Sequence, residues 1–256
     1  MPYYEVWQRD VIPAGGPIIG PALALVDICV DVVSGTWPPA LDQDAPLIVV
    51  ANHPYGILDG LGTLSLVEQL GRPYKVLIHK DLMKVPEIQP FSLPIDFEPT
   101  RAAQATNLAT RKEALRLLAE GTTIVVFPGG GVSTAPINAA AAVDLPWKPF
   151  TARMIQSSGA QVLPLYYEGQ CSRLFQWVSR FSPTLRTSLL IREFRSQVGK
   201  SLKVHVGDVI PYTDMAQVKD RKAMIEMLCA KVHALGGIDM SDLRANQTAL
   251  PEWLRG

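Results

Sequence analysis

The sequence predicts an α/β fold, a single domain with a mixed, largely parallel sheet flanked by helices. Short β-branched apolar runs alternate with longer segments that have helical spacing. No Gly-, Pro- or Ser-rich linker divides the chain. Of the 256 residues, 48% are hydrophobic and 19% are charged, a composition that excludes intrinsic disorder and suits a large buried core.

The expected elements alternate along most of the chain. In order, we expect strands at 46–51, 74–79, 93–97, 122–127, 161–167 and 202–206. We expect helices at 59–70, 102–120, 148–158, 184–196 and 214–234. The helix at 102–120 has the clearest pattern, because Leu108, Leu115 and Leu118 keep near-helical spacing and Gly121 follows as a stop signal.

The N-terminal region contains a nearly continuous apolar stretch over residues 17–33, interrupted by Asp27 and Asp31. Two acidic side chains would be costly at a bilayer centre, and the stretch is shorter than the roughly 20 residues that a spanning helix needs. We therefore expect residues 1–40 to form an amphipathic segment with a helix at the membrane interface. A helix packed on the domain is the alternative, and both can hold. Residues 41–240 would then form the main domain, and 241–256 a C-terminal tail without a readable role.

The charge distribution argues against a nucleic-acid partner, because 24 basic residues are balanced by 24 acidic ones. Locally, residues 173–203 contain seven basic residues and one acidic residue, interleaved with aromatic side chains. Such a stretch suits an anionic membrane surface or an acidic carrier protein, although a solvated helix face would look similar. The cysteines Cys29, Cys171 and Cys229 are too few and too widely spaced for a disulfide framework, so we expect them to be reduced, as in the cytosol.

A histidine and an aspartate follow the first expected strand, where ligand sites of parallel sheets are found. Asn52 and His53 come directly after the strand, and Asp59 follows after five further residues. The Asp59 carboxylate can fix the tautomer of His53 and leave its other nitrogen as a general base. The alternative is that Asp59 only caps a helix and His53 is a structural loop residue.

Three consecutive glycines, Gly129, Gly130 and Gly131, follow the strand at 122–127. Their backbone N–H groups can hold an oxyanion or a phosphate, although a turn with positive φ would have the same sequence. No lysine of a P-loop follows, no GxSxG elbow occurs, and no residue cluster has metal-ligand spacing. A base and an oxyanion site without a protein nucleophile indicate attack by a substrate hydroxyl on an activated acyl group.

These motifs resemble those of the PlsC-type glycerolipid acyltransferases, also called lysophospholipid acyltransferases. The resemblance covers roughly residues 46–211. Its blocks, in the family's order, are Asn52-His53 through Asp59, Leu93-Pro94-Ile95-Asp96 through Arg101, Phe127-Pro128 through Ser133, and Val162-Leu163-Pro164-Leu165. The segment from Tyr167-Glu168-Gly169 to Phe175 is similar to bacterial members.

The resemblance implies a function and a mechanism. His53 would be the general base, Asp59 would orient it, and the N–H groups of Gly129–Gly131 would stabilise the oxyanion. The acyl donor would be a thioester of acyl carrier protein or coenzyme A, with no metal, no other cofactor and no covalent intermediate. The acceptor would be a lyso-lipid, and the enzyme would lie on the cytoplasmic face of the bacterial inner membrane as a peripheral or monotopic protein. The acceptor-binding candidates are Asn52, Arg101, Ser133 and Arg173.

The sequence departs from the common family pattern in two ways. Five residues separate His53 from Asp59 where four are usual, a spacing that resembles bacterial relatives linked to aminolipid synthesis, and Gly56 is the expected place for the extra residue. In the glycine block, Gly129 and Val132 stand where the family has Glu and Arg. The missing arginine is a natural phosphate partner.

The departures favour a lyso-aminolipid acceptor, such as an ornithine-lipid-like one, over lysophosphatidate. Lysophosphatidate remains the alternative, with Arg101 or Arg173 supplying the charge. Two further alternatives are a catalytically silent lipid-binding relative and a thioesterase-like hydrolase.

Overall fold

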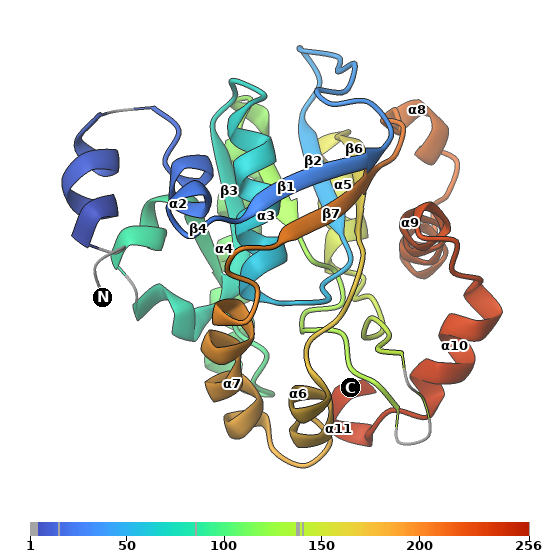
Figure 1. Cartoon of the computed structure of the whole chain (residues 1–256). Coiled ribbons are helices and arrows are strands. Elements are labelled where there is room, and N and C mark those ends of the chain that lie inside the picture. Colours follow the sequence, from blue (N-terminus) through green and yellow to red (C-terminus); the bar gives the residue numbers. More distant parts are fainter. Residues whose placement is uncertain (1–4, 15, 85, 137–138, 140, 256) are drawn as a thin grey trace.

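The computed structural model describes residues 5–14, 16–84, 86–136, 139 and 141–255, and these form a three-layer α/β structure (Figure 1). The strands are β1 (Cys29–Ser34), β2 (Leu47–Ala51), β3 (Tyr74–His79), β4 (Ser92–Ile95), β5 (Thr123–Val126), β6 (Gln161–Tyr167) and β7 (Ser201–Val206). The α-helices are α2 (Ile19–Leu25), α3 (Ile57–Glu68), α4 (Arg101–Ala119), α5 (Phe150–Ser158), α6 (Arg173–Val178), α7 (Pro183–Arg195), α8 (Tyr212–Met215), α9 (Arg221–Leu235), α10 (Met240–Thr248) and α11 (Glu252–Arg255). Shorter helical turns occupy Trp7–Val11, Ile12–Ala14, Lys80–Lys84 and Pro86–Phe91.

The strands form one seven-stranded sheet in the order β1-β7-β6-β2-β5-β3-β4. Neighbouring strands are parallel except β6 and β7, which are antiparallel. The expected mixed, largely parallel sheet is therefore confirmed. At its centre β2 pairs with β5 in the register Ile48↔Ile124 and Val50↔Val126, so these two strands end side by side.

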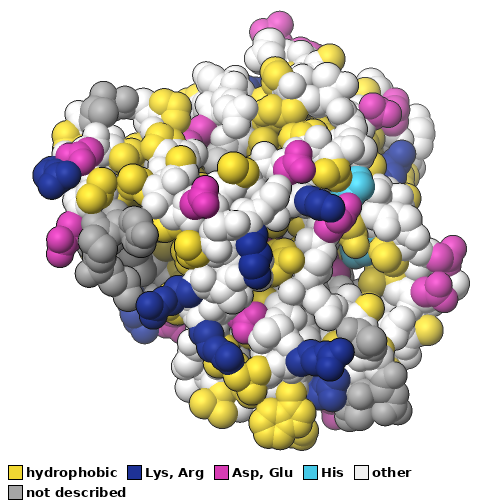
Figure 2. Space-filling model, viewed as in Figure 1, with side chains coloured by type: hydrophobic (Ala, Val, Ile, Leu, Met, Phe, Trp, Pro, Cys, Tyr) yellow, Lys and Arg dark blue, Asp and Glu magenta, His cyan; other side chains and the backbone are white. Residues whose placement is uncertain are grey.

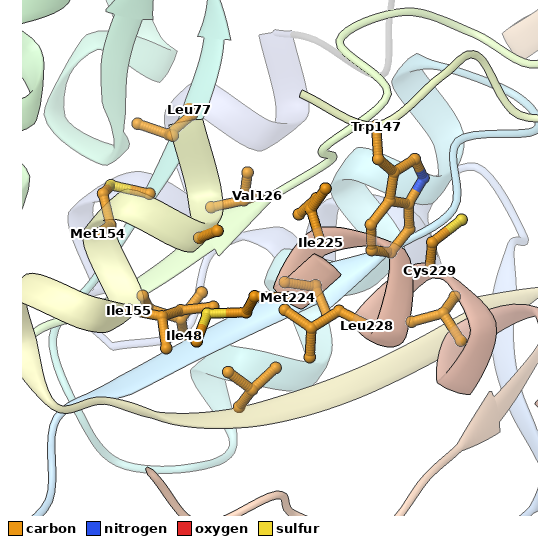
Figure 3. Packing of buried hydrophobic residues seen from close by; sticks show 14 of the residues in the cluster. Ile48, Leu77, Val126, Trp147, Met154, Ile155, Met224, Ile225, Leu228 and Cys229 are labelled. Carbon is orange, nitrogen blue, oxygen red and sulfur yellow. The ribbon is translucent and has the colours of Figure 1, made fainter. Parts of the chain in front are cut away.

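Two buried clusters lie on opposite faces of the sheet, because successive side chains of a strand point to opposite sides. Ile48 and Val50 of β2 belong to the cluster beneath α4, α5, α9 and α10, part of which is seen in Figure 3. Leu47 and Val49 of the same strand belong to the cluster beneath α2 and α3. All five residues of β2 are buried, which explains its uninterrupted apolar sequence.

The expected helix over 17–33 is wrong beyond residue 25. Helix α2 ends at Leu25, Asp27 adopts a positive φ of 53°, and β1 begins at Cys29 and pairs in parallel with β7. The sheet therefore begins before residue 41. The helical part packs on the domain, with Ile19 and Leu23 buried in the core.

Glu68, at the end of α3, holds α2 in place. Its carboxylate accepts hydrogen bonds from the backbone N–H groups of Ile18, Ile19 and Gly20, at 2.8 to 3.1 Å. These are N–H groups that a helix start leaves without intrahelical partners. Across the described residues we find no helix with the length and apolarity required to cross a bilayer.

The C-terminal half differs from expectation in three places, the first of which is the additional helix α6. The expected helix at 214–234 is divided into α8 and α9, and the Asp220 side chain caps α9 by accepting the N–H of Ala223. Residues 240–255 contain α10 and α11. Leu243, Leu250 and Leu254 of this segment are buried in the core. Residues 241–255 therefore contribute to the core of the domain.

We predict that Leu243→Ala lowers the free energy of unfolding by about 3 kcal/mol, because it leaves a cavity where a side chain is 1% exposed. Leu108→Ala, at a side chain that is 44% exposed, is the matched control and should change stability little. Urea denaturation measures both variants. An equal effect of the two substitutions would mean that α10 does not belong to the folded core.

Candidate active site

The ends of β2 and β5 bring the two sequence motifs together. His53 follows β2, and Phe127 follows β5 and leads into the glycine loop (residues 129–131). The His53 and Phe127 rings stack with centroids 4.2 Å apart and an interplanar angle of 28°. The strand pairing therefore places the expected base beside the expected oxyanion loop.

Asp59 lies in the first turn of α3 and its side chain is fully buried. Its Oδ1 lies 3.2 Å from Nδ1 of His53, while its Oδ2 accepts the N–H of Tyr55 and its Oδ1 the N–H of Gly60, each at 2.9 Å. The His53 ring is not aligned for a hydrogen bond, so Nδ1 has no bonded partner among the described residues. Catalytic hydrogen bonds are often long or bent without substrate. The proximity makes Asp59 the group able to orient this ring.

Gly56 accommodates the extra residue between His53 and Asp59. It precedes α3 with φ +78°, a conformation that side chains other than glycine rarely adopt. A Cβ there would lie 2.8 Å from Cγ2 of Val132 and 3.1 Å from Cδ2 of Leu190. The turn is thus closely packed between the glycine loop and α7.

The backbone of the glycine loop has some N–H groups engaged and others available. Gly130 has φ +70° and donates its N–H to the Phe127 carbonyl at 2.9 Å, and Ser133 donates its N–H to the His53 carbonyl at 2.7 Å. Within the described part of the chain, the N–H groups of Gly129 and Gly131 donate to no atom. These two groups are therefore the loop's remaining donors for an oxyanion.

Asp144 is a buried carboxylate that sequence analysis missed. Its Oδ1 accepts the backbone N–H of His53 at 3.1 Å and the Ser133 hydroxyl at 3.0 Å. Its Oδ2 accepts the indole N–H of Trp147 at 2.7 Å. One carboxylate thus connects the backbone of His53 to Ser133, just after the glycine loop.

The path of the chain explains how Asp144 reaches this position. Thr134 and Val143 exchange two backbone hydrogen bonds, at 2.9 and 3.1 Å, so the intervening loop returns beside Ser133. In the sequence, Asp144 is the only acidic residue between 128 and 150. A lone acid within an Ala- and Pro-rich loop was the available signal.

Arg186, from α7, is the second buried charged residue that sequence analysis did not assign to the site. Its Nη1 donates to the Thr134 hydroxyl at 2.8 Å, its Nη2 donates to the Val132 carbonyl, and its guanidinium lies 5.5 Å from the centre of the Phe175 ring. Burial lowers the pKa of Arg186 to about 10. No carboxylate forms an ion pair with it in the described structure, and a Cβ on Gly131 would lie 3.7 Å from its Nη2. No pattern in the sequence distinguishes it from the surrounding arginines.

The four acceptor-binding candidates separate into two groups. Asn52 and Ser133 are buried and engaged: Asn52 exchanges two hydrogen bonds with the Tyr167 backbone, at 2.9 and 2.7 Å, and the Ser133 hydroxyl donates to Asp144. Arg101 and Arg173 are exposed first residues of α4 and α6, and neither side chain has a hydrogen bond or ion pair among the described residues. The structure thus makes Ser133 and Asn52 part of the framework of the site, whereas, in the part of the chain that it describes, it shows no contact that joins the two arginines to it.

Metal-ligating side chains do not gather at this site. In the described ranges, no group of three or more His, Cys, Asp or Glu side chains is arranged to hold a metal ion.

A family model gives this geometry its context. The model, described as acyltransferase, matches residues 30–239, which include every site residue named above. The chain belongs to this acyltransferase family. The expectation of an acyltransferase enzyme is therefore confirmed.

The fold of this acyltransferase is similar to the crystal structure of PlsC from Thermotoga maritima, a 1-acyl-sn-glycerophosphate acyltransferase. The TM-score is 0.51 and the sequence identity 18%, over 93% of this chain and 80% of that chain. At this identity the likeness concerns the fold, and it confirms the expected PlsC-like architecture. No curated protein matches the sequence significantly.

We predict that Asp144→Asn disturbs the position of His53 more than substrate binding. The amide retains one acceptor oxygen, so one of the buried donors loses its partner, and the free energy of unfolding should fall by about 2 kcal/mol. We expect kcat to fall about tenfold or more with KM nearly unchanged. Asp208→Asn, at an exposed position, is the control. An unchanged kcat would contradict a positioning role, even if stability falls.

Proposed function

We propose that this acyltransferase moves a fatty acyl group from an acyl thioester to the free hydroxyl of a lyso-lipid. The observation that carries the proposal is the arrangement of His53, whose Nδ1 lies 3.2 Å from a buried carboxylate, beside a loop with two uncommitted N–H groups. The Ser133 side chain is buried and is held by Asp144, so it is not placed to reach a bound thioester. Direct attack by the acceptor hydroxyl is the reaction that this set of groups supports.

In the proposed reaction, Nε2 of His53 takes the proton of the acceptor hydroxyl while the hydroxyl oxygen attacks the thioester carbonyl carbon. Asp59 stabilises the imidazolium that forms. The carbonyl oxygen becomes an oxyanion, for which Gly129 and Gly131 offer N–H donors. When the C–S bond breaks, the thiolate receives the proton from His53. The products are an acylated lipid and a free thiol.

The donor and the location are parts of the same proposal. The acyl donor is a thioester of acyl carrier protein or of coenzyme A. The proposed reaction needs neither a metal nor a further cofactor. A lyso-lipid resides in a bilayer, so the enzyme should work as a peripheral or monotopic protein at the cytoplasmic face of the bacterial inner membrane.

For the acceptor headgroup, a lyso-aminolipid is the first candidate. Val132 stands where the resembling family has a phosphate-binding arginine. Its side chain is apolar and buried, and it packs in a cluster with Cys171 and Phe175. The loop itself therefore offers no charged side chain to a phosphate group.

Lysophosphatidate is the second candidate, and the position of Arg186 favours it. This guanidinium carries a charge without a paired carboxylate in the described structure, close to Gly131. It could compensate for the missing arginine of the loop. The Thermotoga maritima neighbour is named as an acyltransferase of 1-acyl-sn-glycerophosphate.

We predict that His53→Ala lowers acyl transfer to a lyso-lipid by about 10³-fold and Asp59→Asn by about 10²-fold, since a general base and its orienting acid are removed. His205→Ala is the matched control, because His205 also has an 18% exposed side chain and an acidic partner, Glu168, at 2.8 Å. The measurement is thiol release from acyl-coenzyme A and acyl carrier protein, with lipid products identified by mass spectrometry. Thiol release without a lyso-lipid would indicate a hydrolase, and full activity of His53→Ala would overturn the mechanism.

We predict a higher kcat/KM for a lyso-ornithine lipid than for lysophosphatidate of the same chain length. The physical reason is the absence of an arginine from the glycine loop. Both acceptors are presented to the wild-type enzyme in the same vesicles, and the acylated products are quantified together. Preference for lysophosphatidate, abolished in Arg186→Gln, would instead assign phosphate recognition to Arg186.

A further inference from the structure

The α6–α7 hairpin (residues 173–195) has a well-anchored inner side. Phe175 is fully buried, and Arg186 donates hydrogen bonds to the Val132 carbonyl and the Thr134 hydroxyl. Two turns further along α7, the buried carboxylate of Glu193 accepts the N–H and the hydroxyl of Ser172, at 2.7 and 2.6 Å, and so fixes the start of α6. The position of the outer side is therefore determined by the core.

The outer side of the hairpin carries its largest apolar side chains into solvent. Trp177, Phe181 and Leu185 are 59%, 69% and 58% exposed, and the Trp177 and Phe181 rings lie 5.4 Å apart. Together with Val178 and Ser182 they line a hollow of about 230 Å³. In Figure 2, yellow side chains gather at the lower end of the molecule, where Figure 1 has α6 and α7. Contiguous exposed apolar groups of this kind mark an interaction surface.

The charged side chains that the hairpin itself exposes are all basic. Arg173 lies one turn before Trp177 on α6, and Arg192 lies two turns after Leu185 on the same face of α7. Both arginines and Arg195 are exposed, whereas Glu193, the only acidic residue of the hairpin, is buried. The hairpin therefore presents an apolar and aromatic surface with exposed arginines. The exposed Glu252 lies nearby on α11, whose Trp253 indole donates to the Arg180 carbonyl.

We propose that the tip of the α6–α7 hairpin is a membrane-docking surface, which inserts Trp177, Phe181 and Leu185 into the interface of an anionic bilayer. Aromatic and aliphatic groups suit the boundary of headgroups and acyl chains, and arginines suit anionic headgroups. A second copy of the chain is disfavoured as the occupant because two cationic tips would repel each other. The binding itself does not depend on the acyl-transfer reaction.

The hairpin also connects this surface to the active site. Leu189 and Leu190 of α7 pack, as Tyr55 does, against the cluster of Val132, Cys171 and Phe175, beside the loops that carry the proposed base and the glycines. A Cβ on Gly56 would meet Leu190 at 3.1 Å. Docking through the tip would therefore bring the bilayer next to the reacting groups.

The test is co-sedimentation of the full chain with vesicles of phosphatidylcholine alone and with added phosphatidylglycerol. The double variant Trp177→Ser/Phe181→Ser should lower the partition coefficient at least about tenfold on anionic vesicles, since two large apolar groups are removed. Arg192→Gln should lower it about fivefold on anionic vesicles only. The controls are Leu108→Ser and Arg153→Gln, at exposed positions of α4 and α5, which should bind as the wild type does.

The outcomes separate the alternatives. Thermal unfolding of each variant identifies a folding defect, and a folded double variant that binds vesicles like the wild type overturns the proposal. Loss of binding to acyl carrier protein or loss of a dimer in size-exclusion chromatography, with vesicle binding unchanged, also overturns it. Activity on water-soluble short-chain substrates keeps the two proposals apart. If the double variant keeps its activity on short-chain substrates and loses activity on vesicles, the docking surface is supported. If the wild type is inactive on both kinds of substrate, only the proposed acyl-transfer reaction is refuted.

Discussion

The parallel pairing of β2 with β5 is the constraint on which the candidate active site depends. Parallel neighbours end at the same edge of a sheet, so the residue after each strand is placed within side-chain distance of the other. His53 and the glycine loop, more than 70 residues apart in sequence, come together for this reason.

Strand pairing alone would leave the loop beyond β5 without a defined shape. Hydrogen bonds to buried charged side chains define that shape. Asp144 satisfies three donors around the base, and Arg186 engages one carbonyl and one hydroxyl of the following segment. Buried charges are tolerated when hydrogen bonds surround them in this way. The loop N–H groups left over are then held in fixed directions, which is the condition for stabilising a developing negative charge without reorganisation.

The sequence was sufficient for features whose signals are local. Most strands and helices were predicted because β-branched runs and helical spacing are read within a few residues, and the His53–Asp59 pair was predicted because a single turn links its members. The error at 17–33 has a non-local cause, since β1 is defined by pairing with β7 about 170 residues away. Asp144 and Arg186 escaped detection because their partners become visible only when the loop and α7 pack together.

Helix α7 carries a constraint of its own. Leu185 and Arg186 are consecutive residues, so along the helix axis they differ by only about 1.5 Å. The first is exposed at the apolar tip and the second is buried on the Val132 carbonyl. Helix α7 therefore lies between the exposed tip and the segment that follows the glycine loop. A lipid whose acyl chain stays in the hydrocarbon can lift its hydroxyl only a short way out of the bilayer. In the proposed docking, α7 would be the element between the bilayer and this segment, which would keep the hydroxyl of such an acceptor near the candidate site.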